Sequence, residues 1–157
     1  MSRQSSKAGL LFDSDTVSDR VVILPAATAT LKKEDHANRR LVLDAVNAAA
    51  ATYTLPKATG SGDEYLIINN GVQTQSVVVA ALGTDVMSGS AFGQSETAGT
   101  TDVFHTTATS DKYTFNVTTT GGLRGDRMRL IDYKAGTWLV HVEFCGSGTL
   151  ATGFSET

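Results

Sequence analysis

The feature that most restricts the fold is a regular alternation of residue types near the C-terminal end of the sequence. In residues 137–144, Trp138, Val140, Val142 and Phe144 occupy every second position. Such a period of two places these four side chains on one face of a β-strand. Burying the single tryptophan removes roughly 150–250 Å² from water, a gross gain of about 4–6 kcal/mol. The alternation therefore predicts a half-buried strand with Trp138 at the centre of the core.

This strand is predicted to form a hairpin with the preceding β-type stretch, residues 127–133. Lys134, Ala135 and Gly136 connect the two stretches. A short connector that ends in glycine suits a hairpin turn with a positive φ at its last residue. Residues 112–118 show a second alternation of apolar and polar residues. The expected core anchors on these stretches are Trp138, Val140, Val142, Phe144, Tyr113 and Phe115.

The rest of the sequence contains short β-type stretches separated by turn residues, without the pattern of a long helix. The chain has 157 residues, of which 41% are apolar and 18% charged. We therefore expect one all-β domain over residues 21–157, a small antiparallel sandwich or barrel that is jelly-roll-like. Residues 69–71, Asn-Asn-Gly, predict a hairpin turn. Residues 83–101, which contain spaced glycines, predict a long functional or mobile loop.

The first 20 residues form a segment of different character, which we expect to be an extended N-terminal arm. It is polar except for three consecutive apolar residues, Leu10, Leu11 and Phe12. One interpretation is a disordered terminus. The other is an arm that orders on a partner, with these three residues as anchors. The sequence leaves both interpretations open.

Composition excludes several classes of protein. The net charge is −3 and the basic residues are scattered, so we expect no nucleic-acid binding. Cys145 is the single cysteine, which excludes an internal disulfide framework. The N-terminus lacks the apolar stretch of a signal peptide, and no apolar run approaches the length of a membrane span.

Residues that resemble a chemical site lack the partners that such a site needs. Asp13, Asp15 and Asp19 are similar to the start of a calcium-binding loop, but Val17 and Leu24 stand where that loop needs oxygen ligands. The three histidines have no cysteine or second histidine at metal-ligand spacing, and no nucleophile elbow is present. We therefore expect no enzyme, no cofactor and no metal site. The histidines are His36, His105 and His141.

Five phrases of the sequence carry a resemblance to a known family. They are RLVLDA at residues 40–45, TYTLPKATGSG at 52–62, TDVMSG at 84–89, TTGGLRGD at 119–126 and GTWLV at 136–140. In this order they resemble capsid decoration, or cement, proteins of tailed bacteriophages and prophages, over roughly residues 29–154. The first 20 residues do not share this resemblance.

The resemblance implies a structural protein that binds and stabilises the outer surface of a phage shell. The implied partner is the major capsid protein, bound by a homotrimer, and the implied location is the outer capsid surface after synthesis in the host bacterial cytoplasm. The alternative is a receptor- or glycan-binding module of a tail or head fibre, which would use residues 83–101 and their single aromatic, Phe92. A polysaccharide-degrading domain is a third possibility and requires a carboxylate pair in a cleft.

Overall fold

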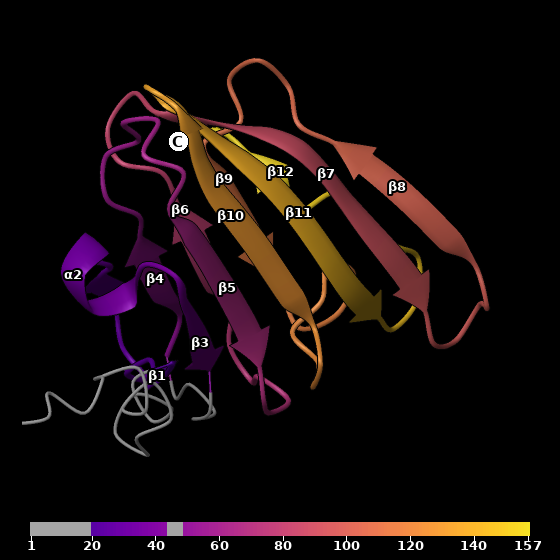
Figure 1. The fold of residues 1–157 in the computed structure, drawn as a ribbon. Helices are drawn as coiled ribbons and strands as arrows, with labels where there is room; N and C mark the ends of the chain where they lie inside the picture. Colours follow the sequence, from indigo (N-terminus) through magenta and orange to yellow (C-terminus); the bar gives the residue numbers. More distant parts are fainter. Residues whose placement is uncertain (1–19, 44–48) are drawn as a thin grey trace, which may run out of the picture.

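The computed structural model describes residues 20–43 and 49–157, which form two β-sheets packed against each other (Figure 1). One sheet has seven strands in the order β1-β3-β5-β10-β11-β7-β8, and the other has five in the order β12-β9-β6-β4-β2. This confirms the predicted all-β sandwich. The strands are β1 (Val21–Ile23), β2 (Ala29–Thr30), β3 (Arg39–Leu43), β4 (Ala51–Thr54), β5 (Glu64–Asn69), β6 (Val77–Ala80), β7 (Val86–Ser95), β8 (Thr101–His105), β9 (Lys112–Phe115), β10 (Arg127–Lys134), β11 (Thr137–Gly146) and β12 (Phe154–Ser155), and the short helix is α2 (Lys33–His36).

The strand pairing is mixed, which corrects the expectation of antiparallel sheets. The chain alternates between the two sheets from β1 to β6, as in the turns of a coil. As a result, β1, β3 and β5 pair in parallel in one sheet, and β2, β4 and β6 pair in parallel in the other. Strands β7 and β11 are also parallel. Period-two patterns do not distinguish the two kinds of pairing, because both place alternate side chains on opposite faces.

The hairpin predicted at residues 69–71 is wrong, because β5 and β6 belong to different sheets. Asn69 is buried there, and its side-chain amide donates a hydrogen bond to the carbonyl of Leu123 at 2.8 Å. Its side-chain oxygen accepts one from the Gln73 amide, also at 2.8 Å. These contacts fix a crossover to the second sheet instead of a tight return.

The predicted hairpin of β10 and β11 is confirmed. Strand β10 pairs antiparallel with β11, and a bulge lies between Asp132 and Lys134. Gly136 has the expected positive φ, 75°. In the seven-stranded sheet this hairpin lies between β5 and β7 (Figure 1).

The long loop predicted for residues 83–101 is wrong, because β7 occupies ten of these residues. Two of its glycines are required by packing against β11. A Cβ atom on Gly89 would overlap the carbonyl oxygen of Val140, and one on Gly93 would overlap the ring of Phe144. The spaced glycines that suggest a loop therefore permit close contact between neighbouring strands.

We expect Gly89→Ala to lower the free energy of unfolding by about 1–3 kcal/mol, because the added methyl group has no space beside Val140. Ser88→Ala, at an exposed position of the same strand, is the control and is expected to change stability by less than about 0.5 kcal/mol. Urea denaturation followed by circular dichroism measures both. Equal midpoints for the two variants would contradict the packing of β7 on β11.

The core lies between the two sheets. All six residues expected to anchor it are buried there: Trp138, Val140, Val142, Phe144, Tyr113 and Phe115. Tyr113 lies among three other rings, with centroids 4.9 Å from Phe115, 5.0 Å from Phe154 and 6.4 Å from Phe144. Leu150 and Phe154 also belong to this core, so neither contributes to an exposed apolar surface.

Candidate functional site

Among the described residues, the broader of the two outer sheet faces is that of the seven-stranded sheet. The five-stranded sheet covers only its inner face, where residues such as Ile67, Met128 and Val142 are buried. The strand register aligns the outward side chains in two rows, each crossing all seven strands. One row is Ile23, Val42, Ile68, Arg127, Glu143, Phe92 and Val103, and the other is Val21, Arg40, Leu66, Arg129, His141, Ser90 and His105.

This outer face carries most of the large apolar residues that the described part of the chain exposes. They lie on the four strands β1, β11, β7 and β8, where alternation directs them away from the core. Exposed apolar side chains on one face mark a candidate protein-binding surface. Here most of them lie towards the two edges of the sheet, with charged residues of β5, β10 and β11 between them. The apolar residues are Val21, Ile23, Leu139, Phe92 and Val103.

Ion pairs occupy the centre of the outer face. Arg129 donates to Glu64 at 2.7 Å, and Arg127 pairs with Glu143, which His141 approaches to 3.4 Å. The hydrogen bond from Arg129 holds the pKa of Glu64 below its usual value, although partial burial opposes this. The pairs are partly exposed, so each contributes little stability, and they give the face a fixed charge pattern.

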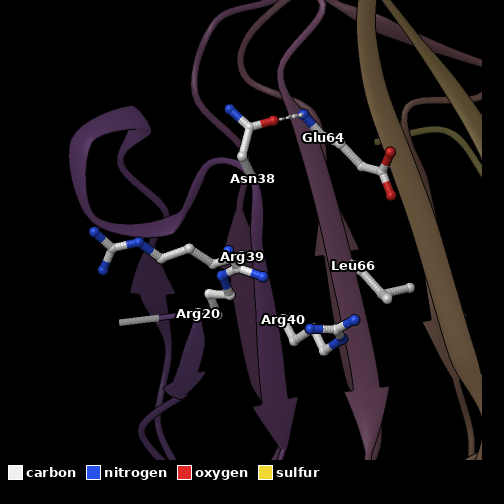
Figure 2. A pocket seen from close by; sticks show the side chains of 6 residues that line it. All are labelled: Arg20, Asn38, Arg39, Arg40, Glu64 and Leu66. Atoms are coloured by element: carbon white, nitrogen blue, oxygen red, sulfur yellow. Dashed lines mark hydrogen bonds between the residues drawn. The ribbon is translucent and has the colours of Figure 1, made fainter. Parts of the chain in front are cut away.

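Three hollows that share lining residues run across the same face. The central hollow, about 360 Å³, lies over the ion pairs. It shares Glu64 and Leu66 with a second hollow of about 320 Å³, called the arginine hollow here, and Glu143 with a third. The arginine hollow is lined by Arg20, Asn38, Arg39, Arg40, Glu64 and Leu66 (Figure 2).

The third hollow, called the Phe92 hollow, lies between β7 and β11 and measures about 300 Å³. An exposed aromatic ring stands beside an amide, a guanidinium and a carboxylate, which are the groups of Gln94, Arg124 and Glu143. A ring beside polar groups of this kind can stack against an apolar ligand surface while the neighbours accept and donate hydrogen bonds.

The loops at the ends of the strands are fixed by buried aspartates. Asp132 accepts hydrogen bonds from the backbone N–H groups of Thr59, Gly60 and Ser61, at 2.8, 2.6 and 3.2 Å. The hydroxyls of Thr59 and Ser61 donate to the same carboxylate. Asp85 accepts from the amide of Ala58 at 2.6 Å. The phrase at residues 52–62 thus contains the end of β4 and a loop that these bonds hold against β10 and against the residue before β7.

A third buried aspartate, Asp126, fixes the turn before β10. It accepts from the amides of Gly122 and Leu123 at 2.7 and 2.9 Å, and from the amide of Cys145 at 2.8 Å. Burial raises the pKa of Asp126, and these three donors oppose that rise. Most of the phrases that carry the family resemblance therefore contain buried aspartates or the loops that they fix.

Within the described residues, no histidine is hydrogen-bonded to a serine or cysteine, and none belongs to a metal-ligand set. His36 lies in α2, where its ring bonds the backbone of Lys32. His105 and His141 lie on the outer face with Ser90 between them in the register. Within residues 20–43 and 49–157, no group of three or more His, Cys, Asp or Glu side chains is placed to hold a metal ion.

Sequence reasoning missed the outer face. The predicted partner-binding residues, Leu10, Leu11 and Phe12, lie outside the described residues. Asp132 had a signal in the sequence, because it takes the inward place after Met128 and Leu130, where an apolar residue is expected. The two outward rows had no signal in the sequence, because they can be assigned only when the order of the strands in the sheet is known. In the described part of the chain, no helix has the length and apolar character to cross a membrane.

Comparison of the chain with protein-family models, with curated proteins and with solved structures finds no match. The resemblance to capsid decoration proteins therefore rests on the five phrases.

Proposed function

We propose that this protein is a capsid decoration protein, which binds the outer surface of a phage major capsid protein shell and stabilises it. The observation that carries the proposal is the broad outer face of the seven-stranded sheet, with exposed apolar residues on both sides of its central ion pairs. A broad face of this kind suits a large, gently curved partner better than a small molecule. The role is structural and requires no catalytic residue or cofactor.

The proposed assembly on the shell is a homotrimer, located on the outside of the virion. Each copy then contacts several capsid subunits, and modest contacts combine through a high effective concentration. Loops that are fixed by Asp132 and Asp126 suit this role, because a rigid surface loses little conformational entropy on binding.

Leu139→Glu is expected to weaken binding to expanded empty capsids of the parent phage at least tenfold, about 1.4 kcal/mol, because it replaces an exposed apolar side chain of the proposed contact face by a charge. Leu139 lies on the outer face and is 43% exposed. Leu82, in the connection before β7, is 44% exposed, so Leu82→Glu is a matched control that should bind within about twofold of wild type. Co-sedimentation with the capsids measures the affinity.

Wild-type protein that fails to bind expanded capsids would contradict the proposed function itself. Equal binding by the two variants would contradict the use of the outer face. Circular dichroism checks that both variants are folded, and both changes are at exposed positions where little loss of stability is expected.

A second candidate function is glycan or receptor binding, and the Phe92 hollow favours it. An exposed ring with neighbouring amide and carboxylate groups suits a sugar, which presents an apolar face and hydroxyls. This candidate predicts that the protein binds host surface polysaccharide and that Phe92→Ala removes the binding. If wild type binds capsids and no polysaccharide, the decoration function stands and the second candidate fails.

A further inference from the structure

The arginine hollow has an excess of positive charge that the described residues do not balance. Three arginines and one glutamate line it. Glu64 bonds to Arg129 at 2.7 Å, and the nearby Asp63 pairs with Lys33 at 2.6 Å. Within the described ranges, the side chains of Arg20, Arg39 and Arg40 form no ion pair. A site with unpaired guanidinium groups attracts carboxylates, which they bind with two parallel hydrogen bonds.

Arg20 and Arg40 are the two arginines placed to meet a ligand on the outer face. Arg40 alternates with the buried Leu41 and therefore points outward, and the backbone carbonyl of Arg20 accepts from the amide of Arg40 at 2.8 Å. In Figure 2 the side chain of Arg39 extends away from Leu66 and Glu64. The hollow thus presents two guanidinium groups beside the apolar side chain of Leu66.

The sequence contains a matching acidic stretch directly before the hollow. Asp13, Asp15 and Asp19 lie within seven residues, and no lysine or arginine occurs from residue 8 to residue 19. Strands β1, β3 and β5 are neighbours, so the hollow spans about 10 Å of sheet. Residues 13–19 reach about 20 Å when extended, which is sufficient to cross it.

Apolar residues also occur next to the charged ones, both in the N-terminal segment and on the sheet surface. Beyond the hollow, the outer face of β1, β3 and β5 exposes Ile23 and half-buries Val42 and Ile68. Residues 10–12, Leu-Leu-Phe, directly precede the acidic stretch. Charge and apolar character therefore occur in neighbouring positions on both the segment and the surface.

We propose that the arginine hollow binds the acidic stretch at residues 13–19 of the same chain, with residues 10–12 packed on the adjoining apolar part of the face. Attachment through Arg20 gives the segment an effective concentration on the order of millimolar, so weak contacts suffice. This inference concerns the free protein and does not rest on the proposed function. It assigns the segment a site on its own domain, which the sequence alone did not indicate.

The test uses the full chain with a nitroxide spin label at residue 14, through Ser14→Cys in a Cys145→Ser background. The probe measures paramagnetic broadening of the backbone amide signals of Leu66 and Ile68. A label six residues from Arg20 gives some broadening even when the segment is detached. The broadening is therefore expected to be strong in this protein and to weaken clearly when Arg20→Glu and Arg40→Glu reverse the charge of the hollow. Adding Asp13→Arg and Asp15→Arg to that variant is expected to restore it, because the attraction is then reversed on both sides.

A charge-matched control carries Lys57→Glu and Arg124→Glu, at exposed positions outside the arginine hollow, and should keep the broadening. Broadening that the charge reversal of the hollow leaves unchanged, or that the restoring changes fail to return to the original strength, would overturn the proposal. A mixed sample tests whether the bound segment comes from the same chain or from a neighbouring copy. In it, one chain carries the spin label without ¹⁵N, and the other carries ¹⁵N without the spin label. Broadening in that mixture would show a neighbouring copy's segment in the hollow and would overturn the assignment to the same chain.

Discussion

Trp138→Ala is expected to lower the free energy of unfolding by about 3–5 kcal/mol, a large part of the stability of a domain of this size. The indole is 1% exposed and packs edge-on against Tyr65, with ring centroids 5.4 Å apart and an interplanar angle of 83°. Removing it leaves a cavity between the sheets that the rigid β10–β11 hairpin cannot close. Urea denaturation followed by circular dichroism measures the loss, since the variant has no tryptophan fluorescence.

Trp138→Phe separates packing from hydrogen bonding. The indole Nε1 has no hydrogen-bond partner among the described residues, so replacing the indole by phenyl removes no hydrogen bond. It keeps an aromatic ring beside Tyr65 and should cost clearly less than Trp138→Ala. Equal losses for the two variants would contradict packing as the source of the effect. A native emission maximum typical of indole in water would contradict the burial itself.

Asp132→Ala is expected to cost about 3 kcal/mol or more, because it removes the acceptor of three backbone N–H groups at once. The three donors are the N–H groups of residues 59–61, so the carboxylate fixes this loop against β10. Asp132→Asn keeps the shape and one acceptor oxygen, so it should retain part of the stability. Thermal unfolding at neutral pH measures both, and an unchanged melting temperature for Asp132→Ala would contradict the role of the carboxylate.

The Asp132 contribution should also depend on pH. Burial by itself raises the pKa of Asp132, but the donors of Gly60, Ser61 and Thr59 outweigh it and lower the pKa overall. Because the pKa is lower in the folded chain than in the unfolded chain, the contribution is full above the ordinary aspartate pKa of about 3.9. It is lost as the pH falls below that value. The difference between wild type and Asp132→Ala should therefore shrink in acid.

The same loop contains a second carboxylate with the same pH dependence. A hydrogen bond from Lys33, with a further one from Ser61, lowers the pKa of Asp63 to about 2. Its stabilising effect is present at neutral pH and is lost between about pH 4 and pH 2. The stabilising contributions of Asp63 and Asp132 are thus lost together in acid. The loop at residues 59–63 should therefore be the part of the domain most sensitive to low pH.

The sequence was sufficient to predict those elements whose pattern is local. Alternation at residues 137–144 identified β11 and its buried face, and Gly136 identified the turn before it, because each depends on adjacent residues only. Residues 83–101 were misread because glycine has two uses. It supplies turns, and it permits close approach between strands, and Gly89 and Gly93 serve the second purpose against a strand about 50 residues later.

The candidate site was out of reach for a related reason. Arg40, Arg129 and Phe92 belong to the same face only because β3, β10 and β7 are members of one sheet. No pattern in the sequence specifies that β10 and β11 lie between β5 and β7. Strands β1, β3 and β5 come from successive turns of the coil and pair in parallel. The connections between these strands differ in length, so the sequence contains no regular repeat that would reveal the pairing.

The position of the β10–β11 hairpin has a consequence for synthesis of the chain. Strands β5 and β7 are complete well before residues 127–146 leave the ribosome, yet in the finished sheet those residues separate them. Until then, β5 has one unpaired edge and β7 lacks the strand against which Gly89 and Gly93 pack. Unpaired edges of this kind promote association between nascent chains. A message truncated before residue 127 should therefore yield insoluble protein, even though most of the strands are present.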